Sequence, residues 1–253
     1  MPIKGTTPNP SAQLPELQEG VIQIWTADLD LQSQAPTALQ TVLSTDERAR
    51  ATRFYFDRDR NRFTATRALL RLLLGRYLKV PPQSIEFSYG PHGKPFLTEE
   101  AHSKVRFNVS HSHEKALLAF AKRFDLGVDV EHQRPERATE ELAKRFFSGP
   151  EVKALKDLPV DLRTSGFFAC WTRKEAFIKA TGGGLSISLS SFTVSVDPRE
   201  PARLVSIQSD SEESSRWLLE NLEVGSDYRA AVAVENNSMR VELQKWNWGA
   251  ISL

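Results

Sequence analysis

The chain has 253 residues, of which 40% are hydrophobic and 26% charged, as in a globular protein of one large domain or two small ones. Its 33 Lys and Arg residues nearly balance 32 Asp and Glu residues, which argues against strong long-range attraction to nucleic acid or an anionic membrane. Cys170 is the only cysteine, no signal-like segment opens the chain, and no apolar run approaches the roughly 20 residues that span a bilayer. We therefore expect a cytoplasmic protein that binds neither nucleic acid nor membrane.

The first half of the chain predicts a tail, a strand, a long helix and a group of strands. Residues 1–20 hold four prolines and few large apolar groups, which predicts a flexible tail. A helix is predicted from Ser44 to Leu78, because Ser44 and Asp46 suit its N-terminal cap and leucines recur at helical spacing. Alternating apolar residues predict strands at VIQIWTADLD, SIEFSYG, VRFNVSHS and KALLAFAKR.

The second half begins with a short strand in FDLGVDVEHQRP. Helices are predicted at ATEELAKRFFSGPEVKALKDL and TSGFFACWTRKEAFIKATG, and strands at SISLSSFTVSV and YRAAVAVE. The mixture favours the α+β class. A Thr-Arg helix that leads to a strand occurs twice, which suggests two similar halves, residues 21–125 and 126–253, although chance order explains the echo nearly as well.

The segment GVDVE places Asp129 and Glu131 two residues apart, and a strand directs such residues to the same face. Paired carboxylates suit Mg²⁺, with waters and substrate phosphates completing its shell; a solvated sheet edge is the alternative. In the next helix, Trp171, Glu175 and Lys179 share one face, so Glu175 offers a third carboxylate. The alternative there is an ordinary surface ion pair between Glu175 and Lys179.

The segment FNVSHSH places Ser110 and Ser112 on one strand face, and His111 and His113 on the other. Two histidines could ligate zinc, but the single cysteine and the scattered remaining histidines supply no closing set of ligands. A serine–histidine hydrolase pair is disfavoured, because neighbours on opposite faces do not meet. A histidine beside a serine can equally hold a phosphate.

The segment DERARATRFYFDRDRNRFTATR interleaves arginines with aromatic residues, as nucleic-acid-binding segments do. Its own acidic residues neutralise much of that charge, so a solvated helix with one or two anion-binding arginines is the preferred interpretation. Lys94, in the turn GPHGKP, is either a loop charge or an anion ligand.

Taken together, GKP, FNVSHS, GVDVE and WTRKEAFIKATGGGL, in this order, resemble the Sfp-type 4′-phosphopantetheinyl transferases over roughly residues 45–195. The resemblance implies an α+β fold of two similar halves related by a pseudo-twofold, with coenzyme A bound between them. It implies transfer of the 4′-phosphopantetheine group to a serine of an apo acyl or peptidyl carrier protein, with release of adenosine 3′,5′-bisphosphate. We expect a monomer.

The resemblance also implies roles for individual residues. The expected Mg²⁺ ligands are Asp129, Glu131 and Glu175. Lys179 is expected to contact phosphate and stabilise the leaving group, and Glu175, or a water that it holds, is the plausible general base.

Other expected contacts are with the two substrates, coenzyme A and the carrier protein. The residues expected at the 3′-phosphate of coenzyme A are Arg53, Arg62, Lys94, Ser110 and His111. Phe146 and Phe147 are expected near the surface that docks the carrier protein. Two other functions stay open: a metal-dependent phosphohydrolase that uses the same acids, and a carrier-binding module without turnover.

Overall fold

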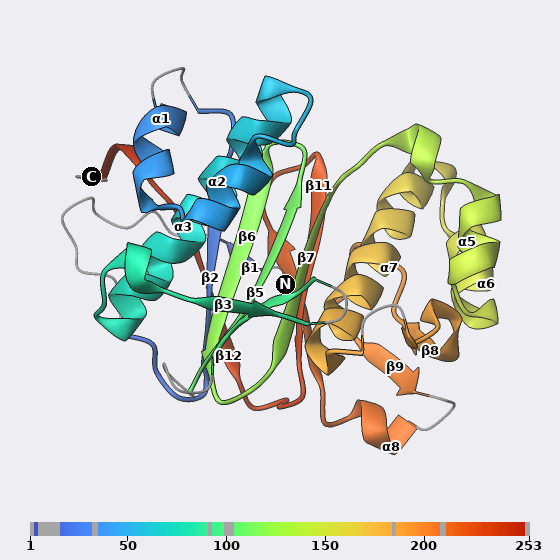
Figure 1. Ribbon diagram of the computed structural model, residues 1–253. Coiled ribbons are helices and arrows are strands. Elements are labelled where there is room, and N and C mark those ends of the chain that lie inside the picture. The colour runs from blue at the N-terminus through green and yellow to red at the C-terminus, as the bar shows by residue number, and fades with distance from the viewer. Residues whose placement is uncertain are drawn as a thin grey trace.

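Two four-stranded sheets lie at the centre of the protein, and helices cover their outer faces (Figure 1). The computed structural model describes residues 3–4, 16–31, 35–90, 93–98, 104–183, 186–207 and 211–250. The first sheet contains, in spatial order, β12 (Arg240–Lys245), β2 (Val21–Asp28), β6 (Lys115–Lys122) and β5 (Val105–Ser112). The second contains β1 (Ile3–Lys4), β10 (Leu218–Glu223), β11 (Tyr228–Val234) and β7 (Leu126–His132).

The order of elements repeats once along the chain, which confirms the predicted echo and the α+β class. The first half runs β2, α1 (Ala35–Leu39), α2 (Thr45–Ala51), α3 (Asp57–Leu78), the ribbon β3 (Phe87–Tyr89) and β4 (Pro95–Leu97), then β5 and β6. The second half runs β7, α5 (Glu140–Phe146), α6 (Gly149–Asp157), α7 (Val160–Thr181), the ribbon β8 (Phe192–Val194) and β9 (Leu204–Ile207), α8 (Ser211–Ser214), then β10 and β11.

Both ends of the chain cross to the opposite half. Strand β12 pairs in parallel with β2, and Trp246 packs in the core of the first half, although the sequence assigns both to the second. Strand β1 pairs in parallel with β10. Most of the expected tail, residues 1–20, lies outside the described residues, but within it Leu17 is buried in the core of the first half.

Buried side chains form three clusters, one between each long helix and its sheet and one between the two sheets. Leu73 of α3 belongs to the first cluster and Phe177 of α7 to the second. Between the sheets, Ile24 of β2 shares a cluster with Val128 and Val130 of β7. Each such side chain contributes roughly 1.5–3 kcal/mol when it leaves water, so the sheets and helices are held as one body.

Two predicted helices are each divided in the structure. The helix expected from Ser44 to Leu78 stops at Ala51 and restarts at Asp57, after Phe56 in an extended conformation. The helix expected at residues 138–158 is interrupted at Ser148, which begins α6 with a capping box to Glu151. A capping box satisfies free backbone N–H groups at a helix start, so Ser148 begins a new helix. Among the described residues, no helix has the length and apolar character needed to cross a bilayer.

Candidate active site

Helix α7 packs directly on strand β7, and Gly127 makes this close approach possible. A Cβ atom added at Gly127 would lie 2.0 Å from the Ala176 carbonyl oxygen and 2.8 Å from the Lys179 Cβ. Only a residue without a side chain fits at such a distance. The glycine of GVDVE therefore brings the polar face of α7 against the two acids that follow it in the strand.

Asp129 lies in this contact and is 4% exposed. Its Oδ1 accepts hydrogen bonds from the Lys179 Nζ at 2.6 Å and the Ser110 Oγ at 2.9 Å. Its Oδ2 is buried without a hydrogen-bond partner. A buried carboxylate oxygen without a partner is costly, so this atom is a natural ligand for a cation.

Two further carboxylates share the negative charge of this region. Burial, and then the charge of Asp129, raises the pKa of Glu131 above its usual range. Burial and Asp129 likewise raise the pKa of Glu175, while Lys179 acts to lower it. The ion pair that Lys179 forms is with Asp129, so the surface Glu175–Lys179 pair is not what the structure shows. Lys179 pairs with Asp129, and the charges of Lys179 and Arg134 only partly offset the effects of burial and Asp129 on the pKa of Glu131.

Side chains of β5 join the two sheets at this point. Asn108 Oδ1, Ser110 Oγ and Ser112 Oγ accept the backbone N–H groups of Val128, Val130 and His132, at 2.9, 3.3 and 3.1 Å. We call these three contacts the seam ladder. As predicted, Ser110 and Ser112 lie on one face of the strand, and the ladder directs that face to β7. The Ser112 Oγ also donates to the Glu131 Oε2 at 2.7 Å.

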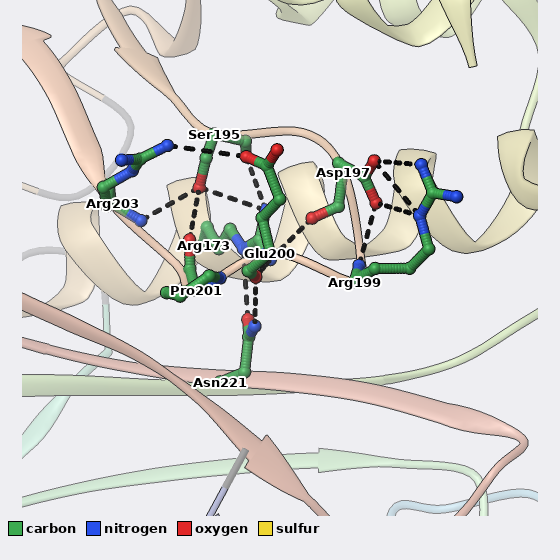
Figure 2. Close-up of polar contacts among 8 residues, drawn as sticks. All are labelled: Arg173, Ser195, Asp197, Arg199, Glu200, Pro201, Arg203 and Asn221. Carbon is green, nitrogen blue, oxygen red and sulfur yellow. Dashed lines mark hydrogen bonds and ion pairs between the residues drawn. The ribbon is translucent and has the colours of Figure 1, made fainter. Parts of the chain in front are cut away.

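Two buried cations anchor the opposite side of α7. The Arg173 guanidinium, at 0% exposure, donates to Asn221 Oδ1, to the Ser195 hydroxyl and carbonyl, and to the carbonyls of Asp197 and Glu200 at 2.7–3.4 Å (Figure 2). Burial lowers the pKa of Arg173 to about 10, so it remains charged at neutral pH.

Lys174 is the second anchor. Its Nζ donates to the Glu151 Oε1 at 2.6 Å and to the Phe192 carbonyl at 2.7 Å, with both charged groups fully buried. Removing one partner of such a pair costs about 3–5 kcal/mol, because the other charge stays buried alone. The two anchors fix α7 on the second half while Glu175 and Lys179 face the seam.

The residues expected at the 3′-phosphate lie around the same seam. Lys94 Nζ donates to the carbonyl oxygen of Lys179 at 2.7 Å. His111 is exposed, yet desolvation by the surrounding protein, followed by the charges of Lys179 and Arg62, lowers its pKa. Arg62 pairs with Asp30 at 2.9 Å. The structure thus brings His111, Arg62, Lys94 and Lys179 into one neighbourhood, in which Arg62 pairs with Asp30 and Lys179 with Asp129.

Ser110 and Arg53 lie in different surroundings. Ser110 is buried in the seam ladder, where its hydroxyl contacts Asp129 and Lys179. Arg53 is exposed and lines a separate hollow of about 580 Å³, together with Arg50, Phe54, Tyr89 and residues at its rim. Gly93, directly before Lys94, also lines this hollow, so it opens beside the same turn.

Phe146 and Phe147, which were expected at the carrier-docking surface, lie in different environments. Phe147 is 3% exposed and packs against Phe167 in the core, with ring centroids 5.1 Å apart, so its expected place at the surface was wrong. It follows the last residue of α5 in an extended conformation, within the core cluster between α7 and the second sheet. Phe146 is half-buried against Trp171, at 5.5 Å, and lies beneath the Arg145 guanidinium.

The donor atoms near α7 fit Mg²⁺ by chemistry but do not form a preassembled cage. Within the described ranges, no three His, Cys, Asp or Glu side chains gather closely enough to hold a metal by themselves. Mg²⁺ usually takes one or two carboxylates plus waters and substrate phosphates, so an open set of carboxylate oxygens suits it. His113 lies beyond the end of β5 with φ of 52°, so it does not continue the strand face of His111 as expected.

Family models of known proteins match both halves of the chain. The N-terminal family model of 4′-phosphopantetheinyl transferases matches residues 30–123, and the 4′-phosphopantetheinyl transferase superfamily model matches residues 125–233. The chain is 41% identical over 214 residues to the 4′-phosphopantetheinyl transferase HetI of Nostoc sp., covering 84% of this chain and 87% of HetI. The chain belongs to the 4′-phosphopantetheinyl transferase family.

A second relative of this transferase is the 4′-phosphopantetheinyl transferase Sfp of Bacillus subtilis. It is 34% identical over 169 residues, which cover 66% of this chain and 72% of Sfp. The family resemblance and the predicted enzyme class are therefore confirmed.

Several structural residues of the site escaped the sequence reasoning. Asn108 was not singled out, and Ser112 was placed only on the strand face of Ser110; the alternation N-x-S-x-S on a strand was the signal available for the seam ladder that they complete. Arg173 and Lys174 lie beside Glu175 in the sequence but anchor the helix instead. Only their apolar neighbours hinted at burial, since charged residues are mostly exposed.

Proposed function

We propose that this transferase moves the 4′-phosphopantetheine group of coenzyme A to a serine of an apo acyl or peptidyl carrier protein, with Mg²⁺. The observation that carries this proposal is the contact between β7 and α7, where the unpartnered Oδ2 of Asp129 lies beside Lys179 and the charge of Asp129 acts on both Glu131 and Glu175. Family membership supports the activity, and these side chains supply ligands for a cation and a hydrogen-bond donor for a phosphate.

Asp129, Glu131 and Glu175 are the residues that would hold Mg²⁺. When bound, the ion would neutralise charge on the pyrophosphate oxygens, which stabilises the transition state of phosphoryl-type transfer. The Lys179 ammonium, which pairs with Asp129, would bind a phosphate oxygen beside it. A phosphate contact there also favours the charged lysine over its neutral form.

The reaction forms one bond and breaks one. The carrier serine oxygen attacks the β-phosphorus of coenzyme A, and the bond from that phosphorus to the bridging oxygen of adenosine 3′,5′-bisphosphate breaks. Glu175 accepts the serine proton, directly or through a water.

The 3′-phosphate end is assigned to His111, Arg62 and Lys94, with Arg53 in the separate hollow beside the Lys94 turn. Desolvation, and then the charges of Lys179 and Arg62, lower the pKa of His111, and a bound dianion would offset the repulsion from those two cations. Ser110 contributes by holding Asp129 and Lys179. Because one chain supplies both halves of this site, we propose that it acts as a monomer. We also propose that it acts in the cytoplasm.

Nucleotide release distinguishes the proposed transfer from its alternatives. The purified chain is incubated with coenzyme A and Mg²⁺, with and without an apo-carrier, and adenosine 3′,5′-bisphosphate is measured by chromatography. We expect release only with the carrier, and its loss in folded Asp129→Ala and Glu175→Ala variants. Equal release without carrier would indicate a phosphohydrolase, and carrier binding without release would indicate a binding module.

A further inference from the structure

The seam ladder replaces an ordinary backbone ladder between β5 and β7. Strand β7 pairs through its backbone with β11 on one side, and on the other its N–H groups are satisfied by side chains of β5. Buried N–H groups left without partners are destabilising, so all three contacts help to join the halves. The ladder is therefore structural in the first place.

Two of its three contacts do more than join strands. A serine hydroxyl donates one hydrogen bond and accepts others. Ser110 accepts the N–H that follows Asp129 and donates to the Asp129 carboxylate, at 2.9 Å. Ser112, two residues further along β5, does the same: it accepts the N–H that follows Glu131 and donates to the Glu131 carboxylate, at 2.7 Å.

Asn108 makes the third contact without a carboxylate. It accepts the N–H of Val128, and the residue before that N–H is Gly127, which has no side chain to hold. The chain thus contains an internal comparison: Asn108 joins the strands only, whereas Ser112 joins the strands and contacts an acid.

We propose that Ser112 is a positioning residue that holds the Glu131 carboxylate in place for a divalent cation. The inference rests on the proposed function, in which Glu131 is a Mg²⁺ ligand. Glu131 is only half-buried, and the charge of Asp129 repels it, so an unrestrained side chain would turn toward solvent. The hydroxyl bond to Oε2 opposes that turn and leaves Oε1 available.

Direct metal binding tests this role, with Mn²⁺ as a spectroscopic probe for Mg²⁺. Mn²⁺ affinity is measured by electron paramagnetic resonance on the full chain with coenzyme A, for wild type, Ser112→Ala, Ser112→Thr and Asn108→Ala, and Tm is recorded for each. Loss of a group that orients a ligand typically weakens metal binding about 10–100-fold. We expect that loss for Ser112→Ala, recovery in Ser112→Thr, and an affinity within about twofold of wild type for Asn108→Ala, despite its lower Tm.

Kinetics add a second readout. Ser112→Ala should need a higher Mg²⁺ concentration for half-maximal rate, while its KM for the carrier stays near the wild-type value. Wild-type Mn²⁺ affinity in Ser112→Ala, or an equal loss in Asn108→Ala, would overturn the positioning role. If Ser112→Ala does not fold, Ser112→Val replaces it and is compared with Ser112→Thr, which has a similar shape and keeps the hydroxyl. Absence of Mn²⁺ binding to the wild-type complex would instead overturn the proposed function itself.

Discussion

Replacing Gly127 with alanine should separate α7 from β7 and so disable the transferase. The added Cβ would lie 2.0 Å from the Ala176 carbonyl oxygen and 2.5 Å from the Ala180 nitrogen, both backbone atoms. Non-bonded contacts need about 3.5 Å, so one element must move by more than about 1 Å. Overpacking of this kind costs about 1–3 kcal/mol of stability. A displacement of about 1 Å at a catalytic group can lower the rate about 100-fold.

The assay compares Gly127→Ala with Gly149→Ala, measuring kcat for carrier modification and Tm. Gly149 is a matched control, because an added Cβ there meets nothing within 4 Å. We expect a lower kcat and Tm for Gly127→Ala and nearly wild-type behaviour for Gly149→Ala. Wild-type kcat and Tm in Gly127→Ala would refute the claim that close packing of α7 on β7 places Glu175 and Lys179.

Three other predictions follow from particular side chains. Burial, with the charges of Asp129 and Glu131, raises the pKa of Glu175 above 4.5, so its ionisation destabilises the folded Mg²⁺-free protein above that pH. Glu175→Gln should therefore abolish transfer but raise Tm at pH 7, with the gain shrinking as the pH falls toward 4; a lower Tm at pH 7 would contradict this. Phe147→Ala should destabilise the fold by about 3–5 kcal/mol, which unfolding titrations measure. Phe146→Ala should raise the carrier KM more than the coenzyme A KM in steady-state kinetics. Equal changes in the two KM values would remove Phe146 from the docking surface. His111→Ala should shrink the preference for coenzyme A over dephospho-coenzyme A, chiefly by lowering kcat/KM for coenzyme A; an unchanged ratio would remove His111 from the 3′-phosphate site.

Local patterns predicted the strands around the site well. Strand β5 spans the eight residues of VRFNVSHS, and β7 lies within FDLGVDVEHQRP. Apolar alternation and flanking turns specify such strands directly. The same-face rule correctly placed Ser110 with Ser112, because it needs no knowledge of tertiary contacts.

What the sequence left open depends on contacts between distant segments. Nothing near residues 240–245 shows that β12 joins β2 more than 200 residues earlier. The buried state of Lys174 depends on Glu151, 23 residues away, and could not be read from local composition. The helix break at Ser148 was readable, since this serine is followed three residues later by Glu151, whereas the break between Ala51 and Asp57 has no capping serine to signal it.

The most direct test of the central claim is the intact mass of an apo-carrier protein after incubation with the transferase, coenzyme A and Mg²⁺. The account predicts that the carrier gains the mass of one phosphopantetheine group on its serine, and that the folded Asp129→Ala variant leaves the carrier unchanged. A carrier panel that shows no mass gain with the wild-type protein, or an equal gain with Asp129→Ala, would contradict it.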